Sequence, residues 1–296
     1  MLGLDLRDAA VVAVLIDEGG WVRKRSQAAG DPAVGAVAAI ESVISTSNAS
    51  GAARALGVAA ANVDSPALPR VLPALLSRFP DLPHHHRVIG SGTAAAVAEA
   101  WIGAARGVPD VVYFSIADHA FAGMVRDGRP VTGAHGRAAA VAWLSLNPVD
   151  REDYRKAGCV EAEVAPAGIV RRLIWRVKAG DHSRVLDAVN GDLGRITLDH
   201  VLDAARDRDG VSVSVIRDTA KYLGMAAANL VAVGDPQMLV LGGIMASAAD
   251  LLLDPIRAEL AHRLPGPMND ALMVSTATLD ADAAAIGAAR HAANWS

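Results

Sequence analysis

Cysteine is almost absent from this 296-residue sequence, which contains only Cys159. One thiol cannot form an internal disulfide, and it falls short of the ligand set of a cysteine-based zinc site. We therefore expect no disulfide framework, no zinc and no other bound metal. Basic charge is not in excess either, because 28 Lys and Arg residues face 32 Asp and Glu residues. This acidic balance argues against a nucleic-acid partner.

Long uninterrupted hydrophobic runs are missing as well. No apolar stretch reaches membrane-spanning length without a charge or a helix breaker. The first residues, "MLGLDL", resemble a strand and lack the basic region of a signal peptide. We therefore expect a cytoplasmic protein without membrane contact. Hydrophobic residues make up 52% of the chain and charged residues 20%, which predicts a sizeable core and a homodimer.

The apolar patterning of the first half predicts an α/β fold with a mixed sheet. Two Leu- and Val-rich runs and an alternating one predict a three-stranded meander, which strands and helices then follow in turn. The predicted strands are 2–6, 9–17, 21–27, 53–63 and 86–90, and the predicted helices are 32–46, 68–79 and 93–106.

The second half begins in a similar way, with a strand at 110–117 and a hairpin around Asp127-Gly128. Helices are expected from about 151 to 232, and the least structured part at about 145–195. Further strands are expected at 237–245 and 271–279, and helices at 250–264 and 280–294. Two such halves predict a duplicated architecture with a cleft. The predicted units are residues 1–105 with the helix 283–296, and residues 106–282 with a helical insert and a dimerisation surface.

Several strings resemble the ROK family, which contains sugar kinases and transcriptional repressors. Residues 231–260 resemble the family's C-terminal run, in which a "DPE"-like turn precedes an "IVLGG" strand, and here they contain "GDPQMLVLGG". Residues 279–292 resemble its closing helix, and residues 111–148 follow its second hairpin. The resemblance implies a two-lobed actin-like ATPase fold of the ribonuclease H-like type, with an interlobe cleft. It also implies a homodimer, which we expect to form through helices between residues 150 and 230. No helix-turn-helix segment precedes the resemblance, which does not favour the repressor branch.

The residues that resemble the family's phosphate loops have changed. A family hairpin of "DxGGT" type corresponds to "DLRDAA", which keeps Asp5 but has Arg7 and Asp8 in place of the glycines. A second loop, "GTGIGGG", corresponds to "ADHAFAG", in which Asp118 and Phe121 appear and only Gly123 remains. Because a carboxylate repels phosphate, neither loop suits its ancestral role.

The resemblance also implies that the residues of sugar chemistry are missing. The family's Asn-Asp pair, whose Asp is the general base, corresponds to Gly90 and Ser91. The Glu and His of a "GEIGH" string correspond to Ala140 and Trp143 in "AAVAW". Together with Asn62, the residues Ser91, Ala140 and Trp143 are the predicted substrate-side positions. A serine hydroxyl is too weakly basic at neutral pH to replace the Asp unaided.

Glycines on the nucleotide side are partly kept. The family's glycine pair lies against the adenosine and corresponds to Gly242 and Gly243 in "VLGGIM". These two residues and Gly123 are therefore the predicted cofactor-binding positions, with ATP as a possible cofactor. The alternative, which we favour, is that small residues end a buried strand where helices pack closely.

Two interpretations are open for the role of several other polar residues. Asp118 and His119 could form a new acid-base pair or could be exposed loop residues, and Arg7 and Asp8 could bind an anion or form a mutual salt bridge. Ser91 and Thr93 are expected to cap the following helix. Trp143 could stack on a sugar ring or fill the old pocket. The run His84–His86 could hold a metal, although successive side chains rarely converge on one ion.

Two functions follow from these observations. The first is a pseudokinase that has lost phosphotransfer and serves as a binding or regulatory protein for a sugar-like small molecule. The second is an active ATP-dependent kinase of a sugar or cyclitol that uses relocated residues. In the first interpretation the positions Asp5, Asp8, Ser91 and Asp118 are remnants of a catalytic site.

Overall fold

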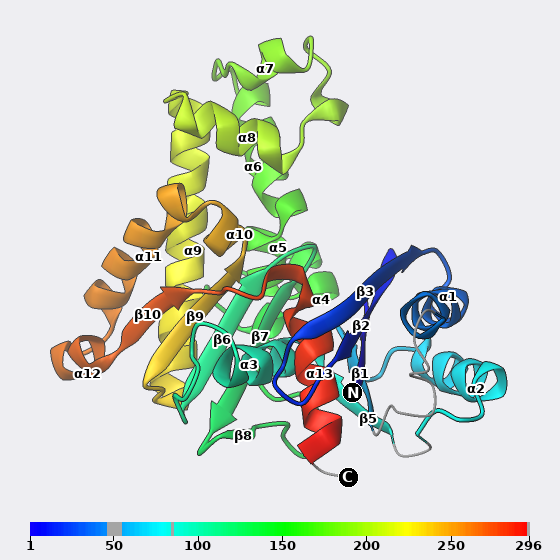
Figure 1. Ribbon diagram of the computed structural model, residues 1–296. Coiled ribbons are helices and arrows are strands. Elements are labelled where there is room, and N and C mark those ends of the chain that lie inside the picture. The colour runs from blue at the N-terminus through cyan, green and yellow to red at the C-terminus, as the bar shows by residue number, and fades with distance from the viewer. Residues whose placement is uncertain (46–54, 84–85, 295–296) are drawn as a thin grey trace.

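The computed structural model describes residues 1–45, 55–83 and 86–294. Two five-stranded mixed sheets form the centres of two lobes, and helices flank each sheet (Figure 1). The expected α/β architecture with two sheets is confirmed. Among the described residues, no helix is both long enough and apolar enough to cross a membrane.

The N-terminal sheet has the strand order β3-β2-β1-β4-β5. Its first three strands form the predicted antiparallel meander, and the last two run parallel to the first. The strands are β1 (Leu2–Leu6), β2 (Ala10–Ile16), β3 (Val22–Ala29), β4 (Leu56–Ala60) and β5 (His86–Gly90).

Strand β2 shows why both faces of this sheet are covered. Val11 and Ala13 pack in a core with the helices α1 (Pro32–Ile44) and α2 (Leu68–Arg78). Val12, Val14 and Ile16 point to the opposite face, since successive side chains of a strand alternate. That face packs against the helices α3 (Ser91–Trp101) and α13 (Ala283–Asn294).

The C-terminal sheet has the order β10-β9-β6-β7-β8 and repeats the pattern of the first. An antiparallel hairpin again lies beside a parallel strand that returns after a long helical crossover. The strands are β6 (Val111–Ile116), β7 (Ala120–Arg126), β8 (Arg129–Pro130), β9 (Met238–Gly243) and β10 (Met273–Thr276).

Along the chain, most helices of the C-terminal lobe follow β8 and precede β10. Several of them extend away from the sheet (Figure 1). The long helix α9 (Gly210–Gly234) packs against its neighbours on several sides. The others are α4 (Glu152–Ala157), α5 (Cys159–Val164), α6 (Pro166–Lys178), α7 (Val185–Ala188), α8 (Leu198–Arg206), α10 (Ile244–Ser247), α11 (Ala249–Arg263) and α12 (Gly266–Ala271).

Two details differ from expectation. The region 145–195, expected to be the least structured, contains four helices, α4 to α7. Helices α4, α5 and α7 have only four to six residues, too few for an amphipathic period to stand out, whereas α6 has 13 residues. The expected side-chain cap of the helix after β5 is wrong, because the residue at the N-cap position of α3 is Gly90, and no side chain caps the helix. Ser91 already belongs to the helix, and its hydroxyl points elsewhere.

The helices α3 and α13 lie side by side between the two sheets (Figure 1). Helix α13 also packs on β1 and β4, while α3 also packs on β7. Glycines allow the close approach, since a Cβ at Gly287 would lie 1.7 Å from the carbonyl oxygen of Ala94, and one at Gly92 would lie 2.1 Å from that of Ala122. The first turn of α3 is therefore held rigidly where the two lobes meet.

Candidate functional site

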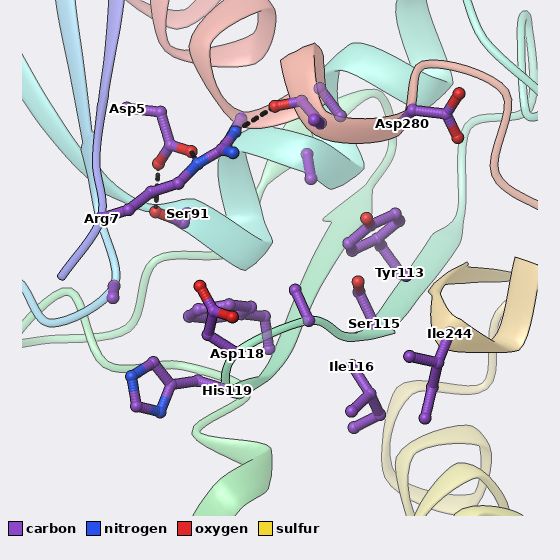
Figure 2. Close-up of a pocket in the computed structure, with 18 of the residues that line it drawn as sticks. Asp5, Arg7, Ser91, Tyr113, Ser115, Ile116, Asp118, His119, Ile244 and Asp280 are labelled. Atoms are coloured by element: carbon purple, nitrogen blue, oxygen red, sulfur yellow. Dashed lines mark hydrogen bonds and ion pairs between the residues drawn. The ribbon is translucent and has the colours of Figure 1, made fainter. Parts of the chain in front are cut away.

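A cavity of about 390 Å³ lies where the two lobes meet, and we call it the interlobe cavity (Figure 2). The turn between β1 and β2, the turn between β6 and β7, the start of α3 and the segment before α13 contribute its walls. The predicted site positions Asp5, Asp8, Ser91 and Asp118 all line this one cavity. Its two hairpin turns are the ones that correspond to the phosphate loops of the resemblance.

Asp5 is held by two neighbours at the floor of the cavity. Ser91 Oγ donates to Asp5 Oδ1 at 2.9 Å, and Arg7 Nε donates to Asp5 Oδ2 at 2.6 Å (Figure 2). Arg7 also donates to the carbonyl oxygen of Ala281 at the start of the C-terminal segment. The expected salt bridge between Arg7 and Asp8 is therefore wrong, because the Arg7 side chain turns back towards the buried Asp5.

Asp8 instead pairs with His119 across the cleft. His119 Nε2 lies 2.6 Å from Asp8 Oδ2, and His119 Nδ1 lies 2.7 Å from Glu161 Oε1. The other Glu161 oxygen accepts the backbone N–H of Ala120 at 2.6 Å. This chain of contacts, which we call the Asp8–His119–Glu161 bridge, joins the tip of the β1–β2 hairpin to the C-terminal lobe.

The Asp8–His119–Glu161 bridge keeps its imidazole charged. The hydrogen bond with Glu161, opposed by desolvation and assisted by Asp8, raises the pKa of His119 to about 9. Of the two interpretations, the acid-base pair of Asp118 with His119 is not formed, since both ring nitrogens of His119 face other carboxylates, whereas Asp118 is an exposed loop residue. Within the described part of the chain, the exposed Asp118 carboxylate has no hydrogen-bond or ion-pair partner.

A second cavity of about 640 Å³ lies on the other side of the bridge, and we call it the substrate-side cavity. The predicted substrate-side positions Asn62, Ser91, Ala140 and Trp143 all line it. Asn62 Oδ1 accepts the backbone N–H of Asp64 at 2.9 Å, which leaves its amide nitrogen for a ligand. The Trp143 side chain does not fill the cavity, because 60% of the residue is exposed.

The loop that precedes Trp143 keeps the conformation of a glycine. Ala139 has φ +57°, in the left-handed region that a side chain disfavours by about 1–2 kcal/mol. In the resemblance this position, the first of "AAVAW", corresponds to the glycine of the "GEIGH" string. The backbone therefore retains a shape suited to glycine, although Ala140 offers only a methyl group in place of the carboxylate.

The three predicted cofactor glycines are each required by packing. A Cβ at Gly123 would lie 2.3 Å from the Gly92 carbonyl oxygen, and one at Gly242 would lie 2.4 Å from the Tyr113 hydroxyl. Gly243 has φ +60°, and its Cβ would lie 1.8 Å from a backbone oxygen of β6. Of the three, only Gly243 lines the interlobe cavity.

The candidate metal ligands are dispersed. Cys159 is buried at the start of α5, and within residues 1–45, 55–83 and 86–294 no three His, Cys, Asp or Glu side chains cluster as a metal site would require. His84 and His85 lie outside the described residues, and His86 belongs to β5.

Three residues of the site were missed in the sequence. Glu161 stands in "KAGCVE", a string that draws attention to Cys159, and nothing local shows that it meets His119. Tyr113 and Asp280 line the interlobe cavity and lie in a strand and in a turn whose sequences carry no catalytic motif. Only the resemblance of the second hairpin to a phosphate loop could have pointed to the region of Tyr113.

A protein-family model described as the ROK family matches residues 88–294. The chain belongs to the ROK family. It is 32% identical over 197 residues to a glucokinase of Halalkalibacterium halodurans, which covers 65% of this chain and 59% of that protein. It is 27% identical over 164 residues to the transcriptional dual regulator NagC of Escherichia coli, which covers 55% of this chain and 39% of that protein. The alignments thus span less than two thirds of the length of these relatives.

Solved ROK structures share the whole fold. A ROK glucokinase from Streptomyces griseus, in complex with glucose and AMPPNP, superposes with a TM-score of 0.79 and 25% identity over 99% of both chains. A ROK transcriptional regulator homologous to the E. coli MLC protein superposes with a TM-score of 0.79 and 22% identity, over 98% of this chain and 76% of that one. The second likeness concerns the fold alone. The actin-like architecture inferred from the sequence is confirmed.

We expect this ROK protein to lose some of its stability as the pH becomes alkaline, because His119 then loses its charge. A folded-state pKa of about 9 lies above the ordinary value of 6.5, so the charged imidazole stabilises the fold below pH 6.5 and loses this contribution as the pH rises through 9. Because His119 is 42% exposed, the contribution should stay below about 1 kcal/mol. In urea unfolding, the free energies of unfolding of the native protein and of His119→Gln should differ at pH 6 and become similar at pH 9.5. An equal difference at both pH values would contradict the bridge.

Proposed function

We propose that this ROK protein has lost phosphotransfer and works as a binding or regulatory protein for a sugar or another small molecule. The observation that carries the proposal is the state of Ser91. By the resemblance its hydroxyl stands at the position of the family's general base; it donates a hydrogen bond to Asp5 Oδ1, and a serine hydroxyl is too weakly basic at neutral pH to replace a carboxylate as the base. Loss of a general base typically costs about 10²- to 10⁴-fold in rate.

The phosphate side adds to that loss. Phosphoryl transfer depends on positioning and on stabilising negative charge. Here the hairpin tips present Asp8 and Asp118, and the cation Arg7 is already bound to Asp5 and Ala281. A triphosphate would meet carboxylates where it needs backbone N–H groups and free cations.

A ligand can still enter the substrate-side cavity. Its volume of about 640 Å³ is of the size that small-molecule sites have, and Asn62 and Trp143 provide an amide and an aromatic face. The relatives named above include a glucokinase and a regulator, and another match is the N-acetylglucosamine repressor of E. coli O157:H7, so hexoses and amino sugars are the first compounds to test. We also propose that the protein is a cytoplasmic homodimer that associates through the helices of the C-terminal lobe.

We expect no sugar-dependent release of ADP above background across a panel of hexoses, amino sugars and cyclitols with Mg-ATP. We also expect Ser91→Asp to remain inactive, because the substituted carboxylate would stand beside Asp5 and the other parts of the site would still be missing. Residues that act as a unit are strongly non-additive, so restoring one leaves the rate low. A coupled assay measures ADP release by the native protein and by Ser91→Asp, and Ser91→Ala serves as the matched control.

Binding is tested separately by calorimetry and by the melting temperature of the protein with each sugar, since a ligand of the native state stabilises it by mass action. Saturable binding of a sugar without turnover supports the proposal. It is overturned if the native protein releases ADP with a sugar. In that case a rate that Ser91→Ala keeps and that Asp8→Ala or Asp118→Ala abolishes would locate the base. The base would then have moved to a hairpin tip.

A further inference from the structure

We propose that the interlobe cavity binds an apolar organic ammonium ion, in the place where a kinase of this fold would hold phosphates. The inference rests on the proposed function in one respect, which is that no triphosphate needs this space. It goes further by assigning a chemical class to the ligand. Three features of the cavity carry it: an apolar interior, cations that are already paired, and two carboxylates without partners at the rim.

The interior of the cavity is mostly hydrocarbon. Leu6, Ile116, Phe121 and Ile244 line it together with the methyl groups of several alanines. Ile116 and Leu6 are buried, and Phe121 occupies a position where a phosphate loop has a small residue. A volume of about 390 Å³ suits a single ring with a short side chain, and such walls favour apolar ligands.

The charged groups of the floor are paired without a ligand. Asp5 binds Ser91 and Arg7, and the guanidinium of Arg7 also reaches a backbone oxygen. Burial raises the pKa of Tyr113 to about 12, so its hydroxyl stays neutral. The cavity therefore has no free cation to attract an anionic ligand, and binding there does not require any internal pair to break.

Two carboxylates at the rim are left over. Asp118 lies in the β6–β7 turn and Asp280 in the turn before α13, on opposite sides of the cavity (Figure 2). Both residues are exposed, and neither side chain forms a hydrogen bond or ion pair with another described residue. Asp5 and Asp8 are matched by Arg7 and His119, so the lining keeps a net charge of about −2 at neutral pH.

This distribution of charge distinguishes between ligands of the same shape. An ammonium group at the mouth of the cavity would lie near Asp118 and Asp280, while its apolar part replaces water inside. A carboxylate or phosphate group at the same place would be repelled. The geometry thus selects for a cationic head on an apolar body, and it selects against a nucleotide.

Three probes of nearly equal size test the proposal on the full chain. They are 2-phenylethylamine, 2-phenylethanol and 3-phenylpropionate, each titrated at pH 7 by calorimetry, with Mg-ATP as a fourth compound. We expect the amine to bind about tenfold more tightly than the alcohol, which corresponds to one charge-assisted contact, and the acid to bind most weakly. Chemical shifts of labelled Ile116 and Ile244 methyl groups should respond to the amine and locate it.

Variants separate the charge from the cavity. The double substitution Asp118→Asn/Asp280→Asn should bring the amine down to the affinity of the alcohol and leave the alcohol unchanged. The matched control is Asp254→Asn, which removes a carboxylate that is 94% exposed on α11, and it should keep the preference for the amine. Both sets of sites are on the surface, so the fold should persist in each variant.

The proposal is overturned if the alcohol binds as tightly as the amine, or if the double variant keeps the preference. It is also overturned if Mg-ATP displaces the amine or shifts the same methyl resonances more strongly. These outcomes are distinct from a failure of the proposed function, which would appear as sugar-dependent ADP release whether or not the amine binds.

Discussion

Replacing Gly57 with alanine should destabilise this ROK protein by about 3 kcal/mol, since overpacking in a close-packed core costs this much or more when backbone must move. Gly57 lies in the middle of β4, and an added Cβ would lie 1.9 Å from the carbonyl oxygen of Ala288 and 2.7 Å from the nitrogen of Ala289. These atoms belong to the backbone of α13, so no side-chain rotation relieves the clash. Urea unfolding followed by circular dichroism measures the loss.

The same substitution tests what α13 does for the interlobe cavity. The start of this helix lines the cavity, so displacing the helix should also weaken the binding of 2-phenylethylamine. Gly210→Ala is the matched control, because a Cβ at the first turn of α9 would meet no atom within 4 Å. We expect the control to change stability by less than about 0.5 kcal/mol. Equal stability of the two variants would show that α13 does not pack on β4 as described.

Replacing Glu163 with alanine should cost about 3–5 kcal/mol, because it leaves a buried cation without its partner. Glu163 Oε2 accepts from Arg172 Nη1 at 2.7 Å, while Oε1 accepts from Arg151 at 2.9 Å and from the Tyr154 hydroxyl at 2.5 Å. The Glu163 side chain is 4% exposed and that of Arg172 is 13% exposed. At these exposures water replaces the lost carboxylate only in part. The three ion-pairing groups join α5, α6 and the segment before α4, so the loss should loosen the helical region.

An exposed pair in the same region provides the control. Glu152 and Lys156 lie 2.7 Å apart in α4, and their side chains are 73% and 74% exposed. Glu152→Ala should change stability by less than about 1 kcal/mol, since exposed pairs are weak and screened by salt. Chemical unfolding measures the free energy of unfolding of Glu163→Ala and Glu152→Ala. If Glu163→Ala were no less stable than Glu152→Ala, the cluster around Glu163 would not be buried in solution.

The order of strands and helices could be predicted from the sequence because it depends on short-range patterns. The alternation in residues 21–27 and the buried run at 2–6 predict strands, and both are found in β3 and β1. The family likeness extends this to the two-lobed fold, which the matched family model and the superposed glucokinase confirm. Helices were expected from about 151 to 232 and are found there, but the expectation that 145–195 is the least structured part is wrong, since α4 to α7 lie within it.

Which positions differ from the family's motifs was also readable in the sequence, because each motif position is defined by a particular functional group. Ser91 and Ala140 lack a carboxylate wherever the chain places them. Their collection around two adjoining cavities follows from the topology that the family likeness implied. The proposal that phosphotransfer is lost therefore depends little on the details of the fold.

The partners of the surviving charges were decided only by the tertiary structure. Arg7 was expected to bind its neighbour Asp8, yet it binds Asp5, and Asp8 binds His119, which is 111 residues away. Arg7 and Asp8 lie in the turn between β1 and β2, and a hydrogen bond needs atoms about 3 Å apart, so the direction in which the turn aims each side chain decides its partner. The folding of the two hairpins towards each other brings Asp8, His119 and Glu161 together, and it leaves Asp118 without a partner.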